Sequence, residues 1–299
     1  MAVNDGFTTK LVHGFQTGDV VVRLIYVNVA VFLLVSLTEV FLTLFNLPCG
    51  GWKTYLMFPA SLETFVRQPW TLFTYMFMHA GVLHLLFNML WLYWFGRLAL
   101  NFFSSVHLRG LYLLGGVMGA AVYMAAYHVF PYFQNQLELA HVVGASASVL
   151  AIVVASAVRE PDYAVRFLFI GEVKLKHVAL FMVVLDLLFM ASDNAGGHIA
   201  HLGGALAGWW FAAGLANGHD ATRWINAVLN VFPVQKKSRR KKPKMEVRFG
   251  TGRQADYDYN ARKKERDDEV NRILDKLRKS GYDSLSSEEK KSLFDAGKR

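Results

Sequence analysis

Charged residues are sparse throughout the long middle of this chain. They are few between Leu24 and Leu215 but dominate from Lys236 onward, and they make up only 18% of the 299 residues. The run from 24 to 47 contains one charge, Glu39. A soluble protein alternates apolar and polar residues to form its surface, and such runs do not. This scarcity excludes a soluble globular fold and predicts a polytopic helical membrane protein with a soluble tail.

Cysteine is also nearly absent. Cys49 is the only one in the sequence, which excludes an intramolecular disulfide and any metal site built from several cysteines. The segment before Leu24 has no cleavable apolar core, so we expect no signal peptide and expect the first apolar run to direct insertion. We find no internal repeat, which argues against a transporter built from inverted repeats.

Six apolar runs are present when the sequence is compared with the ~20 residues that a membrane-spanning helix needs. Two of them are short and must pack among neighbours instead of facing lipid alone. We predict an all-α bundle of six transmembrane helices, near 24–46, 82–100, 108–129, 145–158, 177–191 and 198–216.

Basic residues fall in alternate connections between these runs. The opposite connections contain only Lys53 and Arg67. The positive-inside rule therefore predicts that the basic side and both chain ends are cytoplasmic. The run at 236–242, the main source of the net charge of +9, is better interpreted as an anchor on anionic lipid than as a nucleic-acid site. The other basic residues on this side are Arg97, Arg109, Arg159, Arg166, Lys174 and Lys176.

Three runs carry polar groups at one depth. At about 1.5 Å per residue, Ser146, His84 and His201 lie ~18, ~20 and ~24 Å from the inner ends of their helices. In a layer ~30 Å thick, these depths are roughly 6–12 Å below the outer surface. Asn88 lies one turn after His84 and faces the same way. Polar groups at membrane depth are costly and usually functional, and a serine, a histidine and hydrogen-bond donors are what acyl transfer requires.

The local settings of the serine and of His201 fit this chemistry. Ser146 begins a predicted helix, where unpaired N–H groups favour a developing oxyanion. Gly144 permits a tight turn just before it. Gly204 and Gly208 share a face with His201, and such a stripe of small residues allows close contact between helices.

Taken together, these motifs resemble those of the rhomboid intramembrane serine proteases. The segment PWTLFTYMFMH at 69–79 continues through His84 and Asn88 in the family's His–x4–His–x3–Asn pattern. The GAS motif that ends at Ser146 and the AHLGG motif at 200–204 complete the likeness, which covers roughly residues 20–216. One departure is Leu150, where the family often has an aromatic that supports the imidazole.

The resemblance implies a role for each of these residues. Ser146 would be the nucleophile and His201 the general base, a dyad without a triad acid. His84 and Asn88 would complete the oxyanion hole with the backbone N–H of Ser146, and the two glycines would pack the sixth helix against the fourth. The family hydrolyses peptide bonds in or near transmembrane helices of other membrane proteins and needs no metal or nucleotide. We therefore expect a serine endopeptidase of the bacterial inner membrane; the alternative is a silent rhomboid-like protein that binds client helices.

Several nearby residues have a simpler interpretation. Ser148 lacks a glycine two residues earlier, so Ser146 is the preferred nucleophile. His198, one turn before His201, is interpreted as a solvated histidine or as one that supports the site. Asp186 is expected to make an interhelical hydrogen bond, with a triad acid as the alternative. A metal site is not expected, because the histidines at 79, 84, 198 and 201 lack the His–x3–His spacing of a helix-borne pair.

Changes in composition divide the chain into four parts. We expect an N-terminal segment at 1–20, the membrane protease domain at 21–217, a basic flexible linker at 218–267 and a small helical hairpin at 268–299. Gly281 suits a helix stop, and Ser286 with Glu289 is typical of a capping box. One helical face of the hairpin carries the apolar residues Val270, Ile273, Leu274 and Leu277.

Overall fold

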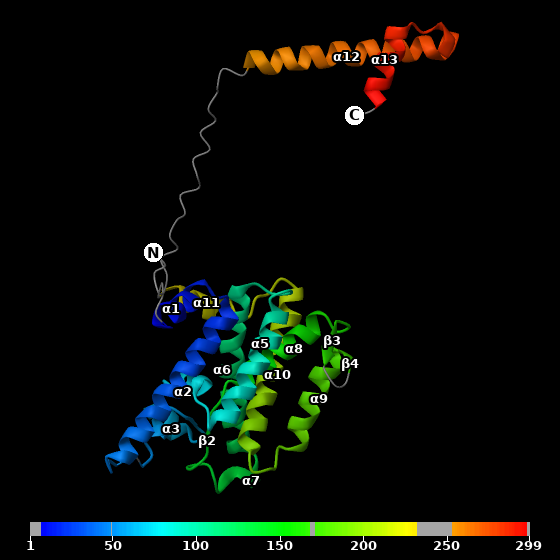
Figure 1. The fold of residues 1–299 in the computed structure, drawn as a ribbon. Helices are drawn as coiled ribbons and strands as arrows, with labels where there is room; N and C mark the ends of the chain where they lie inside the picture. The colour runs from blue at the N-terminus through cyan, green and yellow to red at the C-terminus, as the bar shows by residue number, and fades with distance from the viewer. Residues whose placement is uncertain (1–6, 49, 168–170, 232–252, 298–299) are drawn as a thin grey trace. The chain divides into compact units, whose positions relative to one another are not determined.

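The computed structural model describes residues 7–48, 50–167, 171–231 and 253–297, and these are mostly helical (Figure 1). The chain forms two compact units, Met1–Val234 and Gln235–Arg299. In the first unit, each of the six predicted runs contains a helix. These helices are α2 (Val20–Leu44), α5 (Val82–Ala99), α6 (Ser105–Val129), α8 (Ser146–Arg159), α9 (Leu175–Leu188) and α10 (Ala195–Ala216).

The helices differ in their ability to cross a membrane. Among the described residues, four are long and apolar enough to do so, namely α2, α5, α6 and α10. The helices α8 and α9 have 14 residues each, a rise of only ~21 Å at about 1.5 Å per residue. Six spans therefore stay a prediction, while a multi-pass membrane protein follows from the four long helices.

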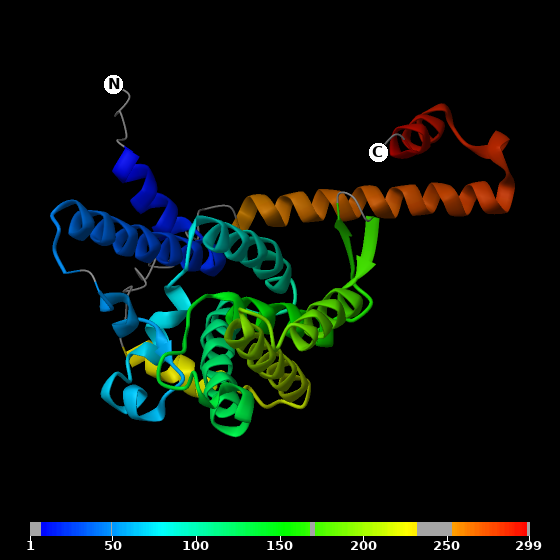
Figure 2. The ribbon, with the colours of Figure 1, turned by 90° about the horizontal axis from the view of Figure 1, so that it is seen from below.

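Helix α8 lies at the centre of the first unit. It packs against α5, α6, α9 and α10, and every side chain from Ala147 to Ala157 is buried. Figure 1 and Figure 2 show α2 and α9 on opposite sides of the bundle. Because α8 is enclosed by protein, its shortness does not leave helix ends facing hydrocarbon.

Small residues bring α6 and α10 close to α8. A methyl carbon added to Gly119 of α6 would lie 2.7 Å from Cβ of Ala147 and 2.9 Å from the carbonyl oxygen of Ala200. Methyl groups on Gly204 and Gly208 of α10 would overlap the carbonyl oxygens of Ala147 and Ala151. Glycine is therefore needed at these contacts by the distance between backbones and not by backbone conformation.

The long helices alternate in direction. Arg97, near the end of α5, forms an ion pair at 3.1 Å with Asp19, just before α2. Arg109, near the start of α6, donates to Asn226 at 2.8 Å, and His107 lies 3.6 Å from Asp220, which follows α10. The basic residues at 97 and 109 thus share one end of the unit. Which side of the membrane this end faces stays a prediction.

Two loops that are distant in the sequence pair with each other at the opposite end of the unit. The first contains η1 (Trp52–Tyr55), β1 (Phe58–Pro59), α3 (Leu62–Arg67), α4 (Thr71–Thr74) and η2 (Tyr75–Phe77). The second contains α7 (Pro131–Gln134) and β2 (His141–Val142). The strands pair antiparallel, with Phe58 opposite Val142. This pairing ties the first loop to the segment that leads into Ser146.

Three buried polar side chains inside the bundle form hydrogen bonds with one another or with backbone carbonyls. Asn28 of α2 donates to the hydroxyl of Tyr112 at 3.1 Å, and this hydroxyl donates to the carbonyl of Met76 at 3.1 Å. The hydroxyl of Tyr75 donates to the carbonyl of Gly116 at 2.5 Å. Such pairing is necessary because an unpaired buried polar group is costly. These bonds hold the segment before α5 against α2 and α6.

A short hairpin connects α8 to α9. Strands β3 (Ala164–Phe167) and β4 (Gly171–Lys174) pair antiparallel, with Ala164 opposite Lys174. Hydrogen bonds from the ammonium groups of Lys176 and Lys174 lower the pKa of the exposed Asp162 carboxyl to about 2. The carboxyl therefore remains ionised in the physiological range, in a turn whose nearest charges are basic.

The ends of the chain are more helical than expected. The segment at 1–20 contains α1 (Phe7–Thr17), and the expected linker contains α11 (Arg223–Val231) and the start of α12 (Arg253–Ser280). Burial of Ile225 and Asn226, with contact of α11 against α6, explains α11. Lys, Arg and Glu are good helix formers, which explains how so polar a segment can form α12. The basic run at 236–242 and Cys49 lie outside the described residues.

The second unit is a helical hairpin. Helix α12 ends before Gly281, whose φ of +78° suits a glycine stop, and η3 (Tyr282–Ser284) leads into α13 (Ser287–Gly297). The predicted capping box is confirmed: Ser286 N–H donates to Glu289 at 2.8 Å, and Glu289 N–H donates to Ser286 Oγ at 3.3 Å. Ile273 and Leu285 are buried in this unit. Hydrogen bonds from Lys276 and from the backbone of Ser286 lower the pKa of Glu289.

Candidate active site

Ser146 is the first residue of α8. The N–H of Val149 closes the first turn on the carbonyl of Ala145 at 2.9 Å. The N–H groups ahead of it therefore lack a partner one turn earlier in the helix. With the positive end of the helix dipole, they favour negative charge at this position. The start of a helix thus supplies electrostatic stabilisation next to a hydroxyl.

Gly144 keeps open a small space in front of Ser146. Its φ is +133°, in a region that L side chains rarely adopt, and its N–H donates to the carbonyl of Tyr75 at 3.0 Å. A methyl carbon added to Gly144 would lie 3.1 Å from Nε2 of His84 and 3.3 Å from Oγ of Ser146. The imidazole of His84 and the hydroxyl of Ser146 therefore lie close together, next to the same face of Gly144.

The hydrogen bonding of His84 gives its ring a direction. Its Nδ1 accepts from the backbone N–H of Ala80 at 3.3 Å. A neutral imidazole that accepts at Nδ1 carries its proton on Nε2. The ring also lies edge-on to His79, with 5.2 Å between the ring centroids. His84 therefore presents an N–H donor to the space that it shares with Ser146.

His201 has the opposite arrangement. Its Nδ1 lies 2.8 Å from Oδ1 of Asp186, in the neighbouring helix α9. A carboxylate can only accept, so the proton of the neutral imidazole is on Nδ1 and the lone pair is on Nε2. His201 is therefore arranged as a proton acceptor, the form that a general base needs.

Glycine contacts bring the turn of His201 next to the turn of Ser146. Gly204 lies one turn after His201 and touches the carbonyl of Ala147, the residue after the serine. On the other side, Gly119 contacts both Ala147 and Ala200. The direct neighbours of the histidine and of the serine thus pack on the same residue of α6.

Asn88 makes a bond within its own helix. Its Nδ2 donates to the carbonyl of His84 at 2.9 Å, and the residue is 7% exposed. A carboxamide has two N–H donors, so this bond leaves the other N–H to be directed elsewhere. Asn88 therefore supports the turn that carries His84.

Ser148 is enclosed elsewhere in the bundle. It is fully buried, and among the described residues its Oγ has no hydrogen-bond partner. A methyl carbon on Gly115 would lie 3.0 Å from the Cα of Ser148, which places this serine against α6. Ser148 therefore lies against α6, whereas Oγ of Ser146 lies next to Gly144 and close to His84.

Asp186 has two partners where we expected one. The interhelical hydrogen bond is confirmed, but the same Oδ1 also lies 2.8 Å from Nδ1 of His198. The spacing of the two histidines indicated a shared helical face but not the carboxylate that both contact. His198 and His201 are three residues apart, which is the spacing of side chains on one helical face.

A comparison with models of protein families adds to this geometry. The rhomboid domain model matches residues 66–218, which is more than half of the chain. The chain belongs to the rhomboid family. The matched region of this rhomboid contains every residue of the candidate site. A second model, a family of unknown function called DUF6576, matches residues 254–298. No curated protein matches the chain.

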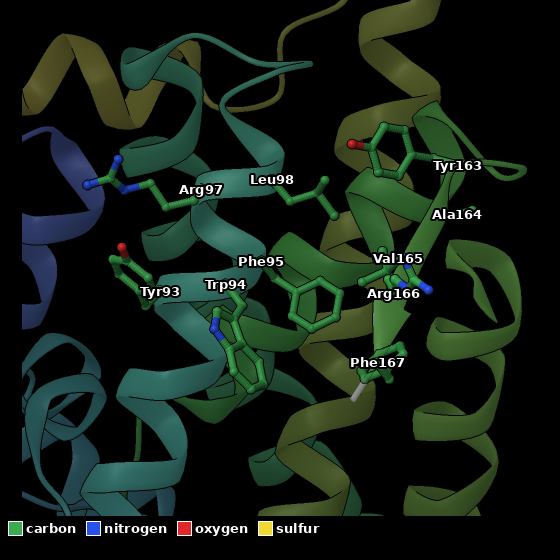
Figure 3. Close-up of a pocket in the computed structure, with 10 residues that line it drawn as sticks. All are labelled: Tyr93, Trp94, Phe95, Arg97, Leu98, Tyr163, Ala164, Val165, Arg166 and Phe167. Atoms are coloured by element: carbon green, nitrogen blue, oxygen red, sulfur yellow. The ribbon is translucent and has the colours of Figure 1, made fainter. Parts of the chain in front are cut away.

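The rhomboid domain also has a pocket away from the candidate site. Its volume is about 1110 Å³, and it lies between the Arg97 end of α5 and strand β3 (Figure 3). In Figure 3 the side chain of Arg97 points away from β3, in keeping with its ion pair to Asp19. Thirteen residues of helix, or ~20 Å, separate this end of α5 from His84. The pocket is lined by Tyr93, Trp94, Phe95, Arg97, Leu98, Tyr163, Ala164, Val165, Arg166 and Phe167.

Proposed function

We propose that this rhomboid is an intramembrane serine endopeptidase that hydrolyses peptide bonds in or near transmembrane helices of other membrane proteins. The observation that carries the proposal is the point shared by Gly144, His84 and Ser146. Because Oγ of Ser146 and Nε2 of His84 lie next to the same face of Gly144, a substrate carbonyl attacked by the hydroxyl would have an N–H donor close to its oxygen. The opposite polarity of His201, a proton acceptor, completes the set of groups that acyl transfer needs.

Acylation would use these groups in the following order. Oγ of Ser146 bonds to the scissile carbonyl carbon while Nε2 of His201 takes the hydroxyl proton. The oxyanion accepts hydrogen bonds from Nε2–H of His84 and from the first turn of α8, with Asn88 as a further donor. The carbon–nitrogen bond then breaks, and the leaving amine takes the proton from His201. Water repeats these steps on the acyl-serine and releases the second product.

The proposal includes a location and an orientation. Arg97 and Arg109 lie at the same end of the bundle, and the positive-inside rule places an end that carries Lys and Arg in the cytoplasm. We place the protein in the bacterial inner membrane with both termini cytoplasmic, so that the start of α8 is near the outer surface. Lipid and transmembrane substrates are then its partners. No nucleic acid, metal or cofactor takes part in the proposed reaction.

The test is cleavage of a model transmembrane substrate by the full-length protein in liposomes. We expect Ser146→Ala to abolish cleavage and labelling by a fluorophosphonate probe, which forms a phosphorus–oxygen bond to Oγ and releases fluoride. The matched control is Ser148→Ala, two residues away in the same helix, which should remain active. Cleavage by Ser146→Ala at the wild-type rate would overturn the proposal. A wild type that binds transmembrane helices without cleaving them would favour the silent alternative.

A further inference from the structure

Asp186 is a buried acidic residue in the apolar stretch of α9 that follows His177. It lies in α9, is 6% exposed, and faces α10. A carboxylate removed from water is costly unless it is paired and hydrogen-bonded. The two histidines of α10 supply this pairing, and both use Nδ1 on one carboxylate oxygen at 2.8 Å. Charge-assisted bonds of this length are among the stronger hydrogen bonds in proteins.

The same contacts could suggest a metal site. The ligand atoms of Asp186, His198 and His201 all lie within 4.8 Å of one another. A tetrahedral zinc ion with ~2.1 Å bonds keeps its ligand atoms about 3.3 Å apart. Both nitrogens are closer than this to Oδ1, at the distance of a direct hydrogen bond. The geometry therefore favours protons between these atoms over a cation.

The two histidines have different surroundings. The ring of His198 lies against Phe189, with 5.7 Å between the ring centroids. His201 is one turn nearer to Gly204, where α10 touches the residue after Ser146. Both rings have a lone pair on Nε2, but only His201 lies in the turn of α10 that packs against the serine helix. His198 thus serves as a second donor to Asp186.

We propose that Asp186 is a positioning residue that holds His201 in the form that can accept the Ser146 proton. This role rests on the proposed function. The carboxylate keeps the proton of the neutral ring on Nδ1, which leaves Nε2 as the acceptor. When His201 takes the serine proton, the ring becomes positive and Asp186 stabilises that charge in an environment of low dielectric constant. His198 keeps the carboxylate in place by occupying the same oxygen.

A merely structural role for Asp186 would give a different experimental result. If Asp186 only tied α9 to α10, its loss would lower stability, and the rate would fall only as folded protein was lost. The useful variant is therefore Asp186→Asn, which has nearly the same size and can still form hydrogen bonds. Its amide can donate to Nδ1 of His201, which moves the ring proton to Nε2 and removes the acceptor. We expect kcat to fall at least ~10²-fold, as is typical when a triad acid becomes an amide, with KM little changed.

Two further variants complete the design. Asp186→Glu keeps a carboxylate, and we expect it to recover part of the rate lost in Asp186→Asn. His198→Ala removes a histidine from the same face but leaves the bond between Asp186 and His201. We expect it to lower kcat by no more than about fivefold, equivalent to one ordinary hydrogen bond. The contrast between loss of His198 and loss of the carboxylate separates positioning from general packing.

The experiment measures kcat, KM, fluorophosphonate labelling rate and melting temperature for the full-length protein in liposomes, with and without EDTA. A large loss of kcat in Asp186→Asn at a wild-type melting temperature supports the positioning role. A wild-type kcat in this variant, with cleavage still dependent on Ser146, overturns it and leaves the proposed function standing. A loss that follows the melting temperature also overturns it, as does wild-type activity that EDTA abolishes. A wild type without Ser146-dependent activity overturns the proposed function and this role together.

Discussion

His84 of α5 and His201 of α10 are both imidazoles, but their neutral rings carry the proton on opposite nitrogens. His84 accepts at Nδ1 from the N–H of Ala80, four residues earlier in its own chain segment. His201 donates at Nδ1 to Asp186, which comes from another helix. The partner of Nδ1 therefore decides whether Nε2 is a donor or an acceptor. Around Ser146 this difference yields one group that can stabilise an oxyanion and one that can remove a proton.

The largest loss of activity is expected when His201, the proton acceptor, is replaced. We expect His201→Ala to lower kcat by ~10⁴-fold or more, as loss of the general base does in serine hydrolases, and to abolish fluorophosphonate labelling of Ser146. Cleavage assays in liposomes, with a melting curve to show that the variant folds, would measure this. Labelling of Ser146 at the wild-type rate would contradict the assignment of His201 as the base.

We expect loss of the donor, His84, to lower kcat less than loss of the acceptor, His201. We expect His84→Ala to lower kcat by about 10²–10³-fold, because it removes one oxyanion donor and leaves the nucleophile and base in place. Slow labelling of Ser146 should therefore persist in this variant, unlike in His201→Ala. Single-turnover labelling of both variants compares them directly, and equal residual rates would show that the two histidines do not have separate roles.

The helix contact next to His201 can be tested without changing a polar group. A methyl on Gly204 overlaps the carbonyl of Ala147, so we expect Gly204→Ala to destabilise the protein by about 1–3 kcal/mol through overpacking. A matched control is Gly81→Ala before α5, because no atom lies within 4 Å of an added methyl carbon there. Thermal or denaturant unfolding in detergent would measure both, and equal stability of the two variants would argue against close packing.

The smallest loss of activity should come from replacing Asn88, which supports the turn of His84. Asn88 donates to the carbonyl of His84, so we expect Asn88→Ala to lower kcat about tenfold, roughly the worth of one good hydrogen bond. Because the proposed reaction also uses the other N–H of Asn88 for the oxyanion, the double variant with His84→Ala should lose more activity than His84→Ala alone. A double variant no slower than His84→Ala would show that Asn88 acts only through His84.

Much of the helical pattern could be predicted from the sequence, because a long apolar run in a membrane has few alternatives to a helix. Each of the six predicted runs contains a helix, and the capping box of Ser286 and Glu289 is present. Helix α11 and the part of α12 that lies before residue 268 were not predicted. The first depends on tertiary contact with α6, and the second is so polar that its composition resembled a linker. Periodic apolar patterns carry no signal for either case.

Within the candidate site, motif spacing was enough to single out Ser146, His84 and His201 and to predict a common depth. It could not assign the ring proton of either histidine, because that depends on which atom lies opposite Nδ1. For His84 the partner is local, and for His201 it is a carboxylate fifteen residues earlier in another helix. The sequence alone therefore determined which polar groups enter the membrane domain. Only the folded structure decided which of them can donate a proton and which can accept one, through the turn before α5 for His84 and the packing of α9 against α10 for His201.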